Sequence, residues 1–349
     1  MTPLDKASLR SMILHAAGVL LMVAGIGLAA MTDYGLINYR LIANRHGGET
    51  TDLGSNANVQ AGPHGHMARI VGTISVPTPV VDPEFNLHVE TPVLIRHVEM
   101  FEWREIRVGG DTNYDLDWVD HPLNARTFER PAGHANPPGF PLDKKQFDAD
   151  IVRIDGFRLS PELVKGLPGS SVVPPDMKAL PANLSASFGL YKNYLTTSAQ
   201  PANPKLGDVR VSWEQIPLRK MTVFARVNGD RLIPASDASD GKGFDIEVGE
   251  VPMLDMLPDL PSPPEFVLFR RITAVVLAAL GAMILLIVRR RRRDPLVALG
   301  LGAMAVGVIS AVLWLGHDTW TMAAWMLFAV LGMALAVSRI RGAARAALH

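Results

Sequence analysis

The chain contains no cysteine among its 349 residues, and its charges balance, with 34 Lys and Arg against 34 Asp and Glu. Without cysteine there are no disulfides, no thiol nucleophile and no zinc–thiolate site, so a folded domain must be stabilised by its own core. A net charge of zero removes the basic groove typical of nucleic-acid-binding proteins. We therefore expect no nucleic-acid partner, no metal and no cofactor.

Asp, Glu, Lys and Arg are also missing from four long apolar runs, at residues 12–31, 272–288, 295–315 and 320–337. A helix needs roughly 17–25 apolar residues to cross the ~30 Å hydrocarbon core of a bilayer. Each run is long enough, so the sequence predicts four membrane-spanning helices. The first run exceeds the roughly 7–15 apolar residues of a signal peptide, which favours a retained anchor over a cleaved leader.

Basic residues flank these runs unevenly, and positively charged loops stay on the cytoplasmic side. One side receives Lys6, Arg10, Arg289, Arg290, Arg291, Arg292, Arg293, Arg339, Arg341 and Arg345. Arg270 and Arg271 lie at the other end of the second run and are outnumbered by the five arginines at 289–293. Those five are also suited to anionic lipid headgroups, at about 1 kcal/mol each.

This orientation divides the chain into eight segments. They are a cytoplasmic N-terminus (1–11), helix 1 (12–31), an extracytoplasmic domain (32–269), helix 2 (270–288), an Arg-rich loop (289–294), helix 3 (295–316), helix 4 (320–338) and a cytoplasmic C-terminus (339–349). The middle domain has the alternating apolar residues and Gly- and Asn-containing turns of β-strands, most clearly at 67–76, 92–119 and 207–248. Residues 32–63 show little periodicity, and beyond Ala43 we expect a loop. The fold class is thus a membrane protein of α+β type.

The strand predicted at residues 92–105 changes the phase of its alternation midway, which indicates β-bulges. Glu102 and Glu105, with Asp115 and Asp117, have the residue types of a glycoside-hydrolase carboxylate pair. On an alternating hairpin they more simply form a solvated face, and we favour that interpretation.

Within the apolar runs, His15 is the one ionisable residue, so a pump or proton-coupled carrier is disfavoured. Small residues recur in all four runs, Gly281 and Gly302 among them. Such residues permit close helix packing within one chain or between chains. We expect a compact bundle, a homo-oligomer or association with other membrane proteins, in contact with membrane lipids.

Blocks of residues in the middle domain resemble, in the same order, those of the transmembrane protein 43 family, also called LUMA. The residues at the centre of these blocks are Trp103, Trp118, Gly133, His134, Asn136, Pro137, Phe157, Ser160, Gly207 and Asp208. The segment from Asp82 to Phe85 looks like the acidic-Phe block of the family, with Asn86 where a glycine is expected. The plan of one N-terminal and three C-terminal spans around a large domain is also similar.

The resemblance implies small, oligonucleotide-binding-like β-barrel modules in the middle domain, a statement about shape alone. Animal members of the family are multi-span proteins of the endoplasmic reticulum and inner nuclear membrane, associated with emerin and lamins. The cysteine-free composition, rich in alanine and arginine, favours a bacterial member with a periplasmic middle domain. No catalytic residue is assigned in the family, so none is carried over.

Two functions remain open. The first is a membrane scaffold or organiser with no catalytic step, which binds proteins or lipids through its middle domain and its helices. The alternative is a membrane-anchored periplasmic enzyme of unknown class that uses His134 as a general base. The same turn also has a structural interpretation, in which Gly133 supplies a positive φ and His134 or Asn136 bonds the neighbouring backbone.

Overall fold

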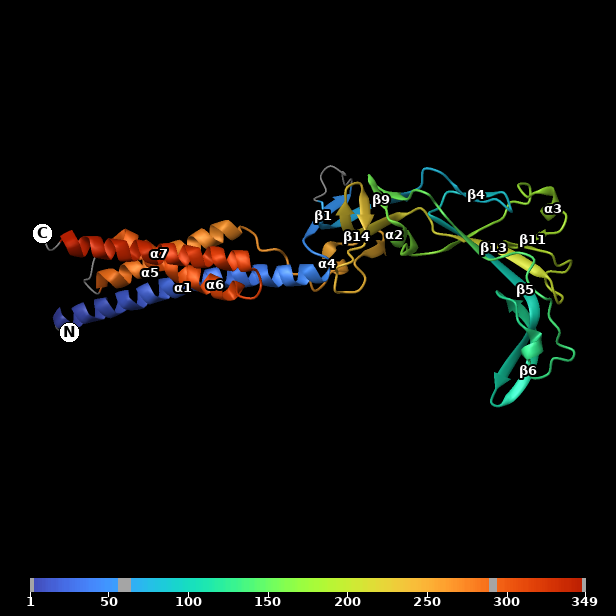
Figure 1. The fold of residues 1–349 in the computed structure, drawn as a ribbon, viewed down its shortest axis with the longest axis horizontal. Coiled ribbons are helices and arrows are strands. Elements are labelled where there is room, and N and C mark those ends of the chain that lie inside the picture. Colours follow the sequence, from blue (N-terminus) through green and yellow to red (C-terminus); the bar gives the residue numbers. More distant parts are fainter. Residues whose placement is uncertain (1–2, 56–63, 289–293, 347–349) are drawn as a thin grey trace. The chain divides into compact units, whose positions relative to one another are not determined.

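The computed structural model describes residues 3–55, 64–288 and 294–346. The chain forms two compact units, one made of the residues up to Asn44 together with those from Pro258 onward, the other of residues 45–257. The first unit is helical and the second is rich in strands (Figure 1). The five arginines at 289–293, on which the predicted orientation depends, lie outside the described residues.

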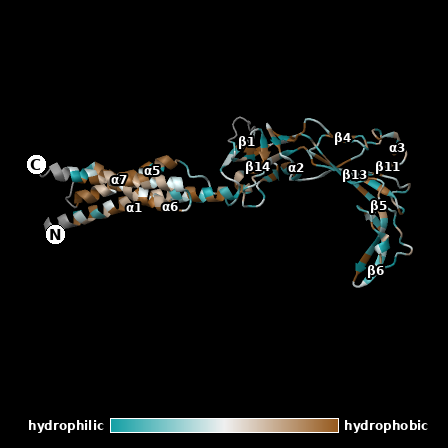
Figure 2. Cartoon of the chain, viewed as in Figure 1, coloured by the Kyte–Doolittle hydropathy of each residue, from teal (hydrophilic) through white to brown (hydrophobic). Residues whose placement is uncertain are grey.

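The helical unit contains four helices long and apolar enough to cross a membrane, as the sequence predicts. They are α1 (Pro3–Arg45), α5 (Val267–Val288), α6 (Pro295–Trp314) and α7 (Thr319–Ala346). Apolar residues run along all of them in Figure 2, whereas the strands show a mixture of polar and apolar residues. Helix α6 begins at an N-cap formed by the side chain of Asp294, which accepts a hydrogen bond from the backbone of Leu296, followed by a proline.

Helix α1 extends well beyond its apolar run. The expected loop is helical as far as Arg45, and β1 (Thr50–Ser55) then pairs with the next strand in parallel. The loop was expected at residues 44–63. This prediction was wrong for residues 44–45, which are helical, and for residues 50–55, which form a strand, while residues 56–63 lie outside the described part of the chain. Strand β1 has no alternating pattern of its own, and its conformation comes from pairing with a neighbour.

Glycine allows the membrane helices to approach closely within one chain. A Cβ atom at Gly281 of α5 would lie 2.6 Å from the carbonyl oxygen of Gly18 in α1, and one at Gly302 of α6 would lie 2.5 Å from the backbone nitrogen of Ala279 in α5. At Gly300, a Cβ would meet the carbonyl oxygen of Gly332 in α7 at 2.5 Å. The small residues are therefore used for packing inside the bundle.

Five strands of the β-rich unit close into a barrel. These are β2 (Met67–Ser75), β8 (Arg153–Ile154), β9 (Phe157–Leu159), β15 (Arg231–Ile233) and β14 (Lys220–Asn228), with β14 pairing back onto β2. Outside the ring, β1 pairs with β2 and β16 (Asp245–Val248) pairs with β14. Ile70, Phe157 and Val223 fill the interior without solvent exposure. This barrel confirms the small β-barrel module that the family resemblance implies.

A second sheet is built around one long strand, β5 (Val93–Val108). Its order is β11 (Gly189–Tyr191), β12 (Tyr194–Thr196), β13 (Val209–Gln215), β5 and β6 (Asp111–Val119), while β10 (Ser171–Val173) pairs with β13 and β7 (Lys145–Asp148) with β5. Short elements complete the unit, namely β3 (Val80–Asp82), β4 (Leu87–Val89), η2 (Ala125–Thr127), α2 (Pro161–Lys165), α3 (Ala182–Ser185) and α4 (Met253–Met256).

Strand β5 runs without the bulges that its sequence indicates. Its register is continuous against β13, from Leu94 to Met100, and against β6, from Met100 to Val108. The even-numbered residues from Leu94 to Glu102 are all buried. Arg96 and Glu102 occupy buried positions where the pattern requires apolar residues, and this made the alternation seem to change phase.

Arg96 is stabilised inside the second sheet by a carboxylate. Both Arg96 and Asp82 are fully buried, and Nη1 of Arg96 lies 3.0 and 3.1 Å from the two oxygens of Asp82. The indole of Trp213 donates to the same carboxylate at 3.0 Å. Asn86 follows this block with φ = 50°, a left-handed conformation that asparagine tolerates, which explains why it can stand where a glycine is expected.

Candidate functional site

The segment that follows β6, residues 120–138, runs back along the β5–β6 hairpin and is here called the strap. The side chain of Asn136 anchors it to β5. The oxygen of this amide accepts from the backbone N–H of Trp103 at 2.8 Å, and the nitrogen donates to the Trp103 carbonyl at 2.9 Å and to the Leu123 carbonyl at 3.3 Å. One asparagine thereby takes the place of a neighbouring strand at this position of β5.

The loop before β13 bonds the same edge of β5 two residues away. The Phe101 N–H donates to the Asp208 carbonyl at 2.8 Å, and the Gly207 N–H donates to the Phe101 carbonyl at 2.9 Å. Gly207 has φ = 87°, and Pro137 lies 3.7 Å from the position of a Cβ there. The edge of β5 covered by β13 up to Met100 is thus continued by this loop and then by Asn136.

His134 lies flat against the hairpin. Its ring stacks on Tyr114 with centroids 3.9 Å apart and meets Trp103 edge-on at 4.8 Å. Its Nδ1 is 2.9 Å from the Arg130 carbonyl, so Nδ1 carries the hydrogen, and its backbone N–H donates to Pro131 at 3.1 Å. Gly133 has φ = 85°. The positive φ of Gly133 and the backbone bond of His134 agree with the structural interpretation of the turn, whereas the ring contacts with Tyr114 and Trp103 were not predicted.

Trp118 lies on the other side of the same region. Its ring is 5.3 Å from that of Phe101, and the guanidinium of Arg210 lies 4.5 Å above it. Arg210 also bonds both oxygens of Glu99, at 2.6 and 2.8 Å. Of the ten residues that carry the family resemblance, eight therefore meet around Phe101–Trp103, and two do not. Phe157 belongs to the barrel core, and Ser160 precedes α2 with 5% exposure.

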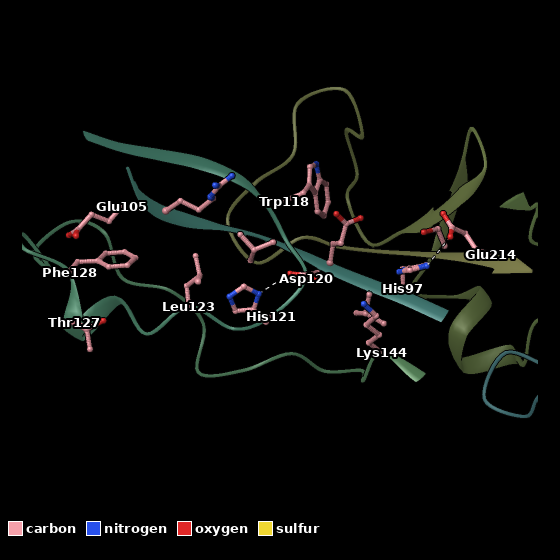
Figure 3. A pocket seen from close by; sticks show the side chains of 15 residues that line it. His97, Glu105, Trp118, Asp120, His121, Leu123, Thr127, Phe128, Lys144 and Glu214 are labelled. Atoms are coloured by element: carbon pink, nitrogen blue, oxygen red, sulfur yellow. Dashed lines mark hydrogen bonds and ion pairs between the residues drawn. The ribbon is translucent and has the colours of Figure 1, made fainter. Parts of the chain in front are cut away.

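A polar groove of about 800 Å³ opens between the hairpin, the strap and β13 (Figure 3). Charged side chains of both signs line it. The ring of His97 lies 3.6 Å from the Glu214 carboxylate, that of His121 lies 2.8 Å from Asp120, and Lys144 also lines the groove. Trp118, Leu123 and Phe128 supply apolar surface, and Thr127 also lines the groove. Within the described residues, no group of three His, Asp or Glu side chains is placed to hold a metal ion.

Glu102 is not part of a solvated face, contrary to our expectation. It is fully buried, its Oε2 accepts from the backbone N–H of Leu123 at 2.9 Å, and its Oε1 has no partner among the described residues. Burial raises the pKa of this carboxyl above 4.5, against the smaller opposing effect of the Leu123 hydrogen bond. No local signal marks Glu102, since neighbouring acids on the same strand are exposed or paired.

The other carboxylates are engaged separately. Glu105 accepts from the Glu129 N–H, from the Tyr114 hydroxyl at 3.0 Å and from Arg107, and the backbone bond is the main cause that lowers its pKa. Asp117 pairs with Arg104. Glu102 and Glu105 are three residues apart on one strand and point to opposite faces, so they do not form the carboxylate pair of a glycoside hydrolase.

Comparison with known proteins agrees with the residue blocks described above. A sequence model of the family described as Transmembrane protein 43 matches residues 104–334. The mouse and human proteins of that name are each 27% identical over 203 residues, covering 50% of this chain and 48% of theirs. The Drosophila melanogaster homolog is 26% identical over 191 residues, covering 50% of both chains. The chain spans about half the length of the curated relatives it matches, and no solved structure matches it. An integral membrane protein by its four helices, the chain belongs to the transmembrane protein 43 family.

Proposed function

We propose that this protein is a membrane scaffold that binds a partner protein in the groove beside the strap, with no catalytic step. The observation that supports this proposal is the use made of the family's shared residues. Asn136, Gly207 and Asp208 bond the backbone of β5, and His134 packs on its aromatic side chains. Residues used in this way make a surface rigid, and rigid, preorganised surfaces bind partners at a lower entropic cost.

The charges of the groove favour a polar partner segment. Some of its polar side chains already pair with each other, as His97 does with Glu214 and His121 with Asp120, and the groove contains charges of both signs. A partner with complementary charges of both signs would be selected by this pattern. The outer edge of β6 is less suited to binding, because Asp115 and Asp117 accept hydrogen bonds from the backbone of the residues that follow them.

We propose in addition a location for the β-rich unit and a surface for assembly on the membrane helices. Lys and Arg counting places the β-rich unit on the side opposite the Arg-rich loop, the periplasm if the membrane is a bacterial inner membrane. Apolar side chains on the outside of α1 and α7, such as Leu20 and Leu331, are exposed and are available to lipid, to a second copy or to another membrane protein.

A site-directed photo-cross-linking experiment tests the scaffold proposal. A benzophenone amino acid is placed at Thr127, an exposed residue that lines the groove, and in a matched variant at Glu247, an exposed residue of β16 outside it. After irradiation in native membranes, we expect a discrete protein adduct from position 127 and not from 247. The adduct from 127 should weaken when Lys144→Glu reverses a charge in the lining of the groove.

Equal adducts from both positions, or none from 127, would contradict a partner site in the groove.

The variant His134→Asn distinguishes the enzyme alternative from the scaffold. This substitution removes the ring contacts of His134 with Tyr114 and Trp103, and we expect both the fold and the adduct to be retained. Loss of a reproducible activity with the adduct and the fold retained would instead support a catalytic His134.

A further inference from the structure

The helical unit carries a second hollow, unrelated to the β-rich groove. It has a volume of about 790 Å³ and lies between α5 and α7 over Leu299 of α6. Its walls are apolar along most of their length, with Ile272, Val276, Ala324 and Phe328 among the lining residues. Small-molecule sites in proteins have volumes of roughly 300–1,000 Å³. The hollow is thus large enough to hold a ligand.

The surface around this groove faces outward from the bundle. The exposed fraction is 54% for Ile272, 47% for Val276 and 85% for Trp320. Because α5 and α7 cross the membrane, such side chains face the hydrocarbon and not water. An apolar groove open to the bilayer is filled by lipid chains, unless another protein covers it.

Polar groups occur at one end of the groove only. Arg271 lies in the second turn of α5 and Thr321 in the first turn of α7, and Trp320 stands beside them. The two helices begin at this end, which is therefore near the membrane surface, and Val276 and Phe328 lie deeper. A gradient from polar to apolar along one groove matches a lipid with its headgroup at the surface and its chain inside.

Arg271 has donors that the protein does not fully use. One terminal nitrogen bonds Asp33 of α1, which is fully buried, and the guanidinium lies 5.0 Å from the centre of the Trp325 ring. Its Nε is buried without a hydrogen-bond partner among the described residues, while 27% of the side chain as a whole is exposed on the wall of the groove. In a medium of low dielectric, a charged group without enough acceptors is costly, so an acceptor in the groove that reaches the exposed part of the guanidinium stabilises this arrangement.

We infer that the groove binds one glycerophospholipid, with an acyl chain between α5 and α7 and its phosphate or ester oxygens accepting hydrogen bonds from Arg271. Asp33 balances the charge of Arg271. The site therefore requires a chain and an acceptor and does not require a net negative headgroup. This inference does not depend on the scaffold function of the β-rich groove.

Native mass spectrometry of the full chain tests the site. The delipidated protein in detergent is titrated with dioleoyl phosphatidylethanolamine or dioleoyl phosphatidylglycerol, and the lipids retained by each chain are counted. Ala324→Trp fills the groove, and Ala323→Trp adds the same bulk on the same helix at an exposed position that does not line it. We expect one tightly held lipid of either kind in the native chain and in Ala323→Trp, and binding about tenfold weaker or more in Ala324→Trp.

A double variant examines the polar end. Asp33→Asn combined with Arg271→Gln removes both charges together and avoids leaving one of them buried alone. We expect this double variant to retain fewer lipids than the native chain.

If Ala324→Trp does not give a monodisperse protein, Val276→Trp fills the groove from α5 instead. Its control is Leu280→Trp, at an exposed position of the same helix that does not line the groove.

Three outcomes would overturn the inference. Equal lipid retention by Ala324→Trp and Ala323→Trp would show that the groove is not the site. Binding of the anionic lipid alone would contradict a charge-balanced Arg271. A dimer in the native chain that Ala324→Trp dissociates, with no lipid retained, would identify a second copy of the chain as the occupant.

Discussion

Asn136 is the residue through which the strap is joined to the sheet. Its amide accepts one hydrogen bond and donates two, and all three partners are backbone atoms of Trp103 and Leu123. Aspartate offers no donor to the two carbonyls, and alanine leaves both the N–H and the C=O of Trp103 without this partner. An amide side chain of this length is therefore required here.

We predict that Asn136→Ala frees the strap locally. Loss of hydrogen bonds to partly buried backbone groups costs about 1–3 kcal/mol, so amide hydrogen exchange at Trp103 should accelerate strongly while the barrel strands keep their protection. Asn203→Ala, in an exposed loop, is the matched control. Unchanged exchange at Trp103 in Asn136→Ala would contradict the anchoring role.

Glu102 makes stability depend on pH in a direction opposite to that of a surface carboxylate. Burial raises its pKa in the folded state above 4.5, so between the unfolded and the folded pKa the folded chain holds more protons than the unfolded one. The contribution of Glu102 to the free energy of unfolding is fully present below this interval, and it falls as pH rises through the interval.

Glu102→Gln should remove this dependence. Glutamine keeps an oxygen for the Leu123 N–H and cannot ionise, so the variant should gain stability relative to the native chain as pH is raised from 4 to 8. Thermal unfolding of both proteins in the same detergent across that range measures the difference. A constant difference at every pH would mean that the pKa of Glu102 is the same in the folded and the unfolded protein, which would contradict the effect of burial.

At the scale of elements, the close packing of helices depends on where glycine stands. A Cβ at Gly281 would come within 2.6 Å of a backbone oxygen in α1, whereas a Cβ at Gly27 would meet nothing within 4 Å. Both glycines belong to apolar helices, and hydropathy does not distinguish them. The contacts across the bundle alone decide which of them is needed.

We expect Gly281→Leu to separate α1 from α5 and to destabilise the bundle by at least the 1–3 kcal/mol typical of overpacked cores. Gly27→Leu adds the same side chain on the outside of α1 and should leave stability within about 0.5 kcal/mol. Size-exclusion chromatography after heating in detergent compares the two. Equal loss of the monodisperse peak in both variants would argue against the packing described here.

The long strand β5 illustrates how much of an element the sequence can predict. Its length, its β-forming residues and its hairpin partner follow from residue types and from the Gly109–Gly110 turn. Its bulges were wrongly predicted, because Arg96 and Glu102 stand at positions that are buried. Their burial depends on Asp82 and on the Leu123 N–H, which come from distant parts of the chain.

At the scale of the whole molecule, the orientation in the membrane is predicted from basic residues and is testable with single cysteines, since the native chain has none. We expect a cysteine at Asn203, exposed in the β-rich unit, to react with a membrane-impermeant maleimide added from outside. A cysteine at Gly342, after the last apolar run, should react only once the membrane is opened. The reverse pattern would invert the orientation.

The sequence by itself determined the four membrane helices, the strand-rich middle and the family, because hydropathy, alternation and residue blocks are local properties. It also singled out Trp103, His134, Asn136 and Gly207, although not the edge of β5 at which they meet. Only the tertiary structure decided the closure of the barrel, the burial of Glu102 and the pairing of Asp33 with Arg271. Each of these depends on groups far apart in the chain, and the free energy of a charge or a strand edge is set by the partner that folding brings to it.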